Sequence, residues 1–287
     1  MRAGRPGGRQ WLAAMPDRVS AQHLLLDYLL DAAQADPVIR WIELGGSLAR
    51  DAGDELSDID AGLGIADAQW PAAITAITDV IHRAGPVADE FRQPFGGKDR
   101  LNGWHLVTLY ASGLQLSLVV VPASWRAGLP PQSVALYDLD AVLARPWTPD
   151  AAVVTAETAR EWACLAWLSL GDLAKYLERG SVWEARKRLE EARGLAWQLW
   201  ALGIGAVYPA YGLTSVLDTP GHTVPAGMQA TVAGLDAAGL RAAARALADV
   251  LDQVTPRALA AVAFDPPGGL RTWARARLGI AGQEEPG

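Results

Sequence analysis

The chain has 287 residues, of which 51% are hydrophobic and 20% charged, so it can form one large or two ordinary domains with a sizeable core. Its net charge of -7 argues against a general affinity for nucleic acid, because proteins that follow phosphate backbones present basic surfaces. No apolar stretch approaches the ~20 residues of a membrane span. We therefore expect a cytoplasmic globular protein without membrane or nucleic-acid partners.

The N-terminal segment predicts a tail, a helix and a strand. Residues 1–18 are expected to form a flexible tail, because the first ten are rich in glycine and arginine. Residues 20–34 have the apolar stripe of an amphipathic helix, which Asp36-Pro37 ends. Residues 38–44 are rich in strand-forming side chains and lead directly into Gly45-Gly46.

Residues 59–65 alternate in polarity, which predicts a strand with two different faces. One face carries Ile59, Ala61, Leu63 and Ile65, and the other continues the row Asp58, Asp60, Gly62 and Gly64. A helix over 69–83 and strands over 87–91, 104–110 and 114–121 follow, the last two joined by the turn Ala111-Ser112-Gly113. Residues 122–133 contain three prolines and are predicted to be a linker.

The second half of the chain has helical periodicity throughout. A long helix over 155–179 is closed by Gly180, and Ser181 and Glu184 have the spacing of a capping box that opens a helix to about residue 202. An irregular loop is expected over 208–225, and further helices over 231–254 and 270–278. The predicted class is α+β, with tails over 1–18 and 281–287 and domains over 19–135 and 136–280.

The segment from Leu44 to Asp60 has the features of a nucleotide and metal site. Two glycines after a strand allow backbone amides to approach a ligand closely, and Ser47 begins a short helix where a hydroxyl can hold phosphate oxygens. Asp58 and Asp60 are two apart on one strand, so they share a face. Paired carboxylates suit Mg²⁺, which prefers hard oxygen ligands and keeps substrate phosphates in its shell.

This segment resembles the signature of the nucleotidyltransferase superfamily related to polymerase β, a Gly-Ser pair followed by Asp-hydrophobic-Asp on the next strand. Gly-Ser-Leu-Ala-Arg over residues 46–50 and Ser-Asp-Ile-Asp over 57–60 are similar to antibiotic-modifying and minimal nucleotidyltransferases. The order of elements is similar to aminoglycoside nucleotidyltransferases across most of the chain. The resemblance implies a nucleotidyltransferase domain with a mixed β-sheet flanked by helices, followed by a helical substrate-binding domain.

The resemblance also implies an activity and the roles of its residues. Gly45, Gly46 and Ser47 are expected to bind the nucleotide, while Asp58 and Asp60 bind Mg²⁺ and are catalytic. AMP is expected to pass from ATP to a hydroxyl of a small polar acceptor, with an aminoglycoside-like antibiotic as the expected substrate.

Two basic residues are further nucleotide candidates. Arg50 is expected either to support the phosphates or to form a surface salt bridge with Asp51 or Asp54. Lys175 is expected to meet the phosphates from the helical domain, or to pair with Asp172 or Glu178 at helical spacing.

One position departs from the family pattern. Related enzymes carry a third carboxylate on a later strand, where this sequence has Ser117, a far poorer metal ligand or base. Three outcomes remain open: a base supplied by Glu90, Glu157, Glu161 or Asp172, slow or altered chemistry, or a nucleotide-binding or toxin-partner module without turnover. The histidines His23, His82, His105 and His222 have no ligand-like spacing, so no zinc site is predicted.

Overall fold

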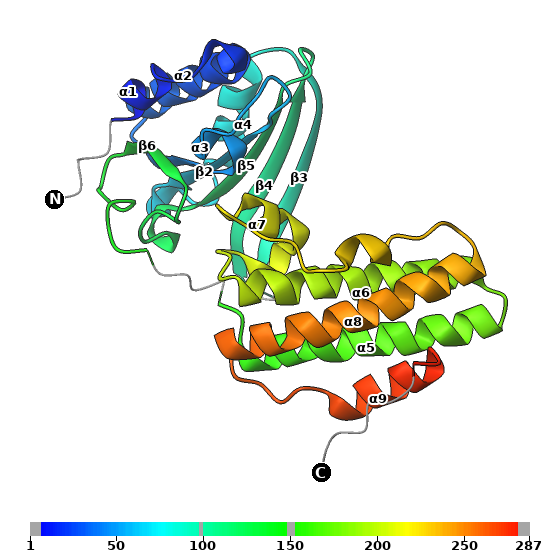
Figure 1. The fold of residues 1–287 in the computed structure, drawn as a ribbon. Helices are drawn as coiled ribbons and strands as arrows, with labels where there is room; N and C mark the ends of the chain where they lie inside the picture. The colour runs from blue at the N-terminus through cyan, green and yellow to red at the C-terminus, as the bar shows by residue number, and fades with distance from the viewer. Residues whose placement is uncertain (1–6, 98–99, 148–152, 281–287) are drawn as a thin grey trace. The chain divides into compact units, whose positions relative to one another are not determined.

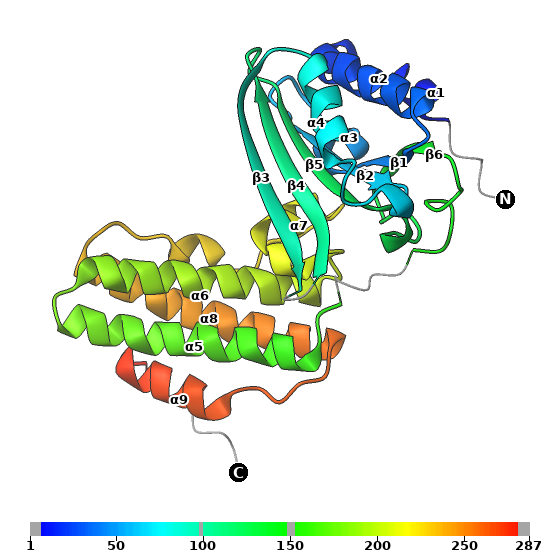
Figure 2. The same ribbon diagram turned by 180° about the vertical axis from the view of Figure 1, so that it is seen from behind.

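The computed structural model describes residues 7–97, 100–147 and 153–280. The chain divides into two compact units, Met1–Pro149 and Asp150–Gly287, and each is described by itself. Figure 1 labels the helices and strands in chain order, and Figure 2 shows the same ribbon from behind. The first unit contains a mixed sheet with helices and the second is helical, so the predicted α+β class is confirmed.

A six-stranded sheet organises the described part of the first unit, with strand order β3-β4-β5-β2-β1-β6. Its strands β2 and β5 run parallel, and the other neighbouring pairs run antiparallel. The predicted hairpin between β4 and β5 is confirmed, and Gly113 in its turn has a φ of +89°. The strands are β1 Ile39–Leu44, β2 Ile59–Ile65, β3 Val87–Gly97, β4 Arg100–Tyr110, β5 Gln115–Pro122 and β6 Val134–Asp138.

Helices α2, Ser20–Ala35, and α4, Ile74–Arg83, cover one face of this sheet (Figures 1 and 2). Their apolar side chains share a core with the predicted apolar row of β2, which is buried. Helix α4 begins five residues later than the expected residue 69. The reason is Pro71, whose ring disfavours a helical conformation of the preceding residue, so that Trp70 is extended. A single 3₁₀ turn, Asp67–Gln69, occupies the intervening segment.

The other sheet face carries the Asp60 row and is only partly covered by apolar residues. A smaller cluster packs there around Trp41, Val121 and Leu143. The space for the Trp41 indole exists because position 64 is glycine: a Cβ on Gly64 would lie 2.2 Å from the indole nitrogen. This cluster leaves the end of the face nearest Asp60 to polar side chains, which form the candidate site described below.

The predicted N-terminal tail and the predicted domain boundary at residue 135 both differ from the structure. The expected tail over 1–18 includes helix α1, Gly8–Leu12, whose Leu12 is only 1% exposed. The glycine that suggested a tail instead permits close packing, because a Cβ on Gly8 would lie 1.9 Å from the carbonyl oxygen of Leu136 in β6. Residues 1–6 of the expected tail, and the C-terminal tail over 281–287, lie outside the described residues.

Strand β6 also changes the limits of the first unit. The expected linker over 122–133 contains a 3₁₀ turn, Ala123–Trp125, and the strand that follows pairs with the edge of β1. The expected boundary between residues 135 and 136 falls inside β6, whereas the compact units divide at Pro149. Pairing between strands about a hundred residues apart leaves no local periodic signal. The proline-rich segment was therefore taken to mark the end of the first domain, although the chain returns to the sheet after it.

The second unit is built on long helices around one apolar core. They are α5 Ala156–Glu178, α6 Val182–Gly203 and α8 Ala237–Ala261, with shorter helices α7 Leu213–Asp218 and α9 Gly268–Arg277. Small residues allow close packing between them: a Cβ on Gly171 of α5 would lie 1.9 Å from the Trp273 ring of α9. The predicted α5 end is confirmed, since Gly180 has a φ of +72°.

Helix starts in the second unit partly differ from the predicted ones. Ser181 is the N-cap of α6 as predicted, but its hydroxyl bonds the Glu184 carboxylate instead of a backbone amide. Helix α8 begins at Ala237 rather than residue 231, because Asp236 caps it by accepting a hydrogen bond from the Gly239 N–H at 2.7 Å. It continues through Pro256 to Ala261, beyond the expected end at residue 254.

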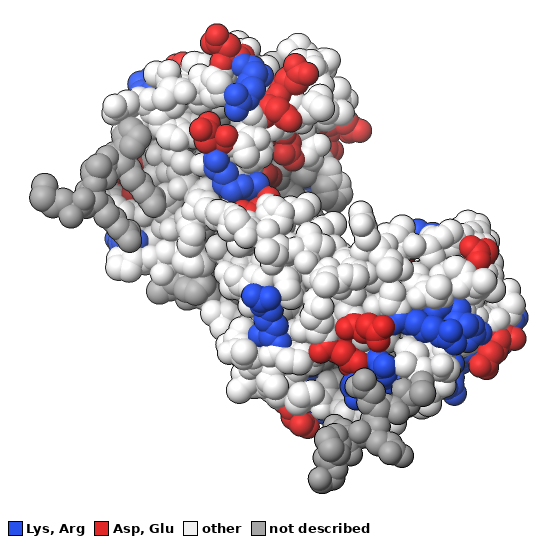
Figure 3. All heavy atoms as spheres, in the orientation of Figure 1, with Lys and Arg blue, Asp and Glu red and all other residues white. Residues whose placement is uncertain are grey.

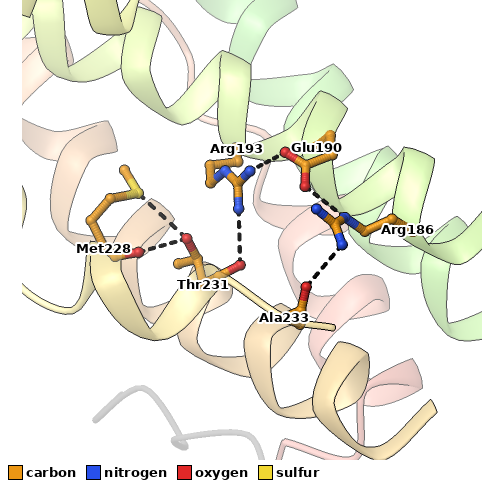
Figure 4. Close-up of polar contacts among 6 residues, drawn as sticks. All are labelled: Arg186, Glu190, Arg193, Met228, Thr231 and Ala233. Atoms are coloured by element: carbon orange, nitrogen blue, oxygen red, sulfur yellow. Dashed lines mark hydrogen bonds and ion pairs between the residues drawn. The ribbon is translucent and has the colours of Figure 1, made fainter. Parts of the chain in front are cut away.

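Arginines of α6 hold the segment that precedes α8 (Figure 4). Arg193 donates to the Thr231 carbonyl at 3.2 Å, and Arg186 donates to the Ala233 carbonyl at 2.9 Å. Both guanidinium groups also pair with Glu190, which orients them. These contacts satisfy carbonyls that a longer α8 would have paired within the helix.

The protein surface carries both acidic and basic side chains, as the amino-acid composition predicts. On the face drawn in Figure 3, acidic and basic side chains are intermixed in small groups. Arg271 and Arg275, for example, both pair with Asp252. Within the described ranges, no helix combines the length and the apolar character needed to cross a bilayer.

Candidate functional site

The Gly45-Gly46 turn lies directly against Asp60 at the end of the β1–β2 pair. The Gly45 N–H donates to the Asp60 carbonyl at 2.8 Å, which ties the turn to β2. Gly46 has a φ of +63°, and a Cβ there would lie 2.3 Å from Oδ2 of Asp60. Position 46 therefore requires glycine for its backbone conformation and for the space that the carboxylate occupies.

Asp58 and Asp60 lie beside strand β5, which adds neutral polar groups. Asp58 immediately precedes β2, and its Oδ2 accepts a hydrogen bond from Nε2 of Gln115 at 3.4 Å. Asp60 is the register partner of Ser117 in the parallel β2–β5 pair. Both carboxylates are partly exposed. Asp60 thus adjoins the glycine turn, and two neutral oxygen-bearing side chains of β5 adjoin the two acids.

Ser47 belongs to the loop that connects this turn to β2. It is the second residue of the short helix α3, Gly46–Ala49, whose N-cap is Gly45. Its hydroxyl contacts the Ser57 hydroxyl at 3.1 Å, and Ser57 in turn donates to Asp54 at 3.1 Å. The Ser47 carbonyl also accepts the Ala52 N–H at 3.0 Å. These hydrogen bonds connect Ser47 to other residues of the loop, so the position of Ser47 is fixed where the loop leaves the glycine turn.

The two cationic candidates lie in different units of the chain. Arg50 ends α3, where its N–H donates to the Ser47 carbonyl at 3.3 Å, so it belongs to the same turn as the glycines. Lys175 is in α5, where its ammonium donates to Asp172 at 2.6 Å and lies 4.8 Å from the centroid of the Tyr176 ring. The ion pair expected as the alternative role of Lys175 is therefore formed with Asp172.

His105 is a candidate residue that the sequence reasoning missed. Its Nε2 lies 2.9 Å from the Ser117 hydroxyl oxygen, and both side chains are partly buried. The sequence analysis considered the histidines only as zinc ligands, so it did not predict a contact between His105 and Ser117. The available signal was the alternation of β4 and β5, which places the two residues on one face once the hairpin register is known.

A partly buried ion pair lies on the same face, on the next strand toward β6. Glu43 of β1 pairs with Arg126, and its side chain is 14% exposed. Burial raises the pKa of Glu43 above its ordinary value, and the attraction of Arg126 offsets this only in part. A Cβ on Gly62, the register partner of Glu43, would lie 2.9 Å from the carboxylate, so glycine leaves room for the pair.

The acids expected to replace the third carboxylate have other positions or partners. Glu90 of β3 bonds His82 of α4 at 2.8 Å, so it lies on the helix-covered face, opposite Asp60. Burial would raise the pKa of Glu90, but hydrogen bonds from His82 and Arg92 outweigh it and lower the pKa. Asp172 pairs with Lys175, while Glu157 and Glu161 are exposed on α5. Glu90 is therefore excluded as the base by its face of the sheet.

The donor set fits a magnesium ion that takes most of its ligands from elsewhere. In the described part of the chain, no group of three or more His, Cys, Asp and Glu side chains converges on one point. Asp58 and Asp60 offer two carboxylates, and Mg²⁺ is commonly bound by one or two carboxylates with phosphates and water completing its shell. The pair suits that mode of binding and does not suit an all-protein cage.

Comparison with known proteins gives a distant likeness in fold. Neither the protein-family models nor the curated proteins contain a match to this chain. Among solved structures, an aminoglycoside 6-adenyltransferase from Bacillus subtilis is similar over 89% of this chain and 97% of its own, with a TM-score of 0.39 and 15% identity. At this TM-score and identity, the likeness assigns neither a family nor a role to any residue.

Proposed function

We propose that the protein is a nucleotidyltransferase that moves a nucleoside monophosphate, AMP from ATP, onto a hydroxyl of a small polar molecule. The observation that carries this proposal is the contact between the glycine turn and Asp60: the carboxylate fills the space where a side chain at position 46 would lie. A glycine turn at the start of a short helix and a pair of acids at the start of the next strand are thereby close together, as a nucleotide–metal complex requires.

Asp58 and Asp60 are the proposed ligands of Mg²⁺. When bound, the ion neutralises charge on the phosphates. The chain's own residues supply position: the β2–β5 pairing keeps Asp60 beside Ser117, and Gln115 orients Asp58 through its hydrogen bond. Because both acids are on or next to one strand, their separation is set by rigid backbone and not by a mobile loop.

The turn formed by Gly45, Gly46 and Ser47 is the proposed binding site of the nucleotide phosphates. Arg50 adds positive charge within the same turn. In the reaction, the acceptor oxygen bonds the α-phosphorus, the bond from this phosphorus to the bridging oxygen breaks, and pyrophosphate leaves with the electron pair. The protein needs no nucleophile of its own, so positioning carries the catalysis.

The acceptor is proposed to be a cationic, polyhydroxylated molecule of the aminoglycoside type. A net charge of -7 attracts a cation more readily than an anion. The helical unit is the proposed source of acceptor specificity, and the activity is proposed to be cytoplasmic and to confer antibiotic resistance. The rival candidate is a module that binds nucleotide, or a toxin partner, without turnover. Ser117 favours that rival, because it stands where a third acid is expected.

Aspartate variants test the proposed function. Asp58→Asn and Asp60→Asn each remove a negative ligand while keeping the side-chain volume, and Asp79→Asn, in an exposed position on α4, is the matched control. We expect MgATP to raise the melting temperature of the wild type and the control but of neither site variant. Pyrophosphate release with a panel of aminoglycosides should follow the same pattern. Magnesium-dependent binding that survives in both site variants contradicts the proposal, and binding without release supports the rival.

A further inference from the structure

Three polar side chains form a row across three neighbouring strands of the first unit. Asp60 of β2 and Ser117 of β5 are register partners, and adjacent strands lie about 4.8 Å apart. Register partners in neighbouring strands direct their side chains to the same face. On the far side of Ser117, β4 places His105 diagonally opposite it, since Ser117 pairs with Val107 and His105 with Val119. The row therefore runs Asp60, Ser117, His105.

The contact between the last two members is a hydrogen bond of 2.9 Å between Nε2 of His105 and the hydroxyl of Ser117. Diagonal neighbours on a sheet are within reach of long side chains, and the histidine uses that reach to turn toward Ser117. When Nε2 carries no proton, Ser117 donates to it, and the imidazole is then able to accept the proton completely. The hydroxyl is thus coupled to a basic group.

We propose that Ser117 and His105 together take the proton of the acceptor hydroxyl, a role that rests on the proposed function. Ser117 lies next to Asp60 and contacts the acceptor, whereas His105 acts through Ser117. As the acceptor oxygen bonds the α-phosphorus, its proton passes to the Ser117 oxygen and the Ser117 proton passes to Nε2 of His105. The bond to the bridging oxygen breaks, and pyrophosphate carries away the electron pair. Charge and atoms balance with the imidazolium as the product.

Two other acids of the sheet, Glu43 and Glu90, have partners of their own. Glu43 shares the face of Asp60, but Arg126 holds its carboxylate through two hydrogen bonds. Glu90 belongs to the opposite face, where His82 and Arg92 bond it. By contrast, the Ser117–His105 pair is adjacent to Asp60 through the strand register itself. The pair explains how a serine can stand at this position in a working enzyme.

Kinetics of five variants test the relay with MgATP and an aminoglycoside panel as probe acceptors. His105→Gln and Ser117→Ala should each lower kcat about 100-fold and leave KM for ATP unchanged, because general-base catalysis contributes about 10²- to 10⁴-fold. Ser117→Asp introduced into His105→Gln should restore turnover, since a carboxylate at 117 accepts the proton directly. His23→Gln is the control. Wild-type turnover in His105→Gln, with turnover abolished in Asp58→Asn, overturns the relay and leaves the proposed function standing.

A spectroscopic measurement tests the placement without relying on turnover. Mn²⁺ with ATP should broaden the imidazole signals of His105 more than those of His23 and His82, which belong to α2 and α4 on the helix-covered face. The signal is assigned with His105→Gln, and water-proton relaxation reports Mn²⁺ binding separately. Binding that Asp58→Asn abolishes, without selective broadening of His105, overturns the relay alone. Absence of any MnATP binding overturns the proposed function, and the relay with it.

Discussion

Glu43 and Gly62 face each other across the β1–β2 pair, and the Glu43 carboxylate fills the space beside the glycine. A Cβ at position 62 would lie 2.9 Å from both Cγ and Oε1 of Glu43. The glutamate has little freedom to retreat, because Arg126 bonds both of its carboxylate oxygens. Gly62, which the sequence showed only as part of a polar row, thus leaves space for a partly buried ion pair.

Gly62→Ala is expected to lower the melting temperature by displacing Glu43 from Arg126. A half-buried charge that loses its partner is costly, because it keeps its desolvation penalty without the compensating attraction. Gly194→Ala is the matched control: it lies within α6, where nothing approaches a new Cβ within 4 Å. Alanine in a helix interior is favoured by roughly 0.5–1 kcal/mol, so this variant should melt higher. Equal melting temperatures for both variants contradict the packing described for Gly62.

Gly46→Ala is expected to abolish stabilisation by MgATP, while Gly45→Ala retains it. The first change adds a side chain at a φ of +63° and in contact with the Asp60 carboxylate, a conformation that costs about 1–3 kcal/mol for a residue other than glycine. At Gly45 the φ is -115°, and a Cβ would lie 3.8 Å from the Asp60 carbonyl oxygen, an ordinary contact. Thermal shift with and without MgATP separates the two. Intact nucleotide binding in Gly46→Ala argues against the site.

Glu90 should make the stability of the first unit depend on acidic pH. Its pKa lies below the ordinary value of 4.5 because hydrogen bonds from His82 and Arg92 outweigh burial. A depressed pKa in the folded state contributes stability above pH 4.5, and that contribution is lost as the pH falls through the folded pKa. The melting-temperature gap between wild type and Glu90→Gln should therefore narrow as the pH falls below 4.5. A melting-temperature gap that widens as the pH falls contradicts a depressed pKa of Glu90. Glu161→Gln on α5 is the control variant.

Arg193→Ala is expected to loosen the segment between Met228 and Asp236. The arginine donates to the Thr231 carbonyl, and a hydrogen bond from a charged group contributes about 1.5 kcal/mol or more. Amide hydrogen exchange in this segment should accelerate, with a smaller effect elsewhere in the helical unit. Lys187→Ala is the control on the same helix, because its side chain is 71% exposed and its ion pair with Glu191 spans 3.7 Å. Unchanged exchange in Arg193→Ala shows that the segment holds its position without the clamp.

The sequence by itself determined the elements whose signals are local. The alternation over β2 predicted both its limits and its buried face, because side chains of a strand point to opposite sides in turn. The end of α5 followed from Gly180, and the β4–β5 hairpin followed from the turn around Gly113. The placement of Asp60 beside the glycine turn also agrees with the motif, although its binding of metal stays a prediction.

Only the tertiary structure decided the features that join distant parts of the chain. Strand β6 pairs with β1, and α1 packs against β6. No strand was predicted over 134–138, which directly follow the proline-rich segment 122–133, and the glycines and arginines near the N-terminus predicted a tail in place of α1. The contact between His105 and Ser117 depends on the register of β4 and β5, and Glu90 is separated from Asp60 by the sheet itself. Periodicity reports which way a side chain points within its own element. Which side chains then meet is set by the pairing of elements, and that is a property of the folded chain.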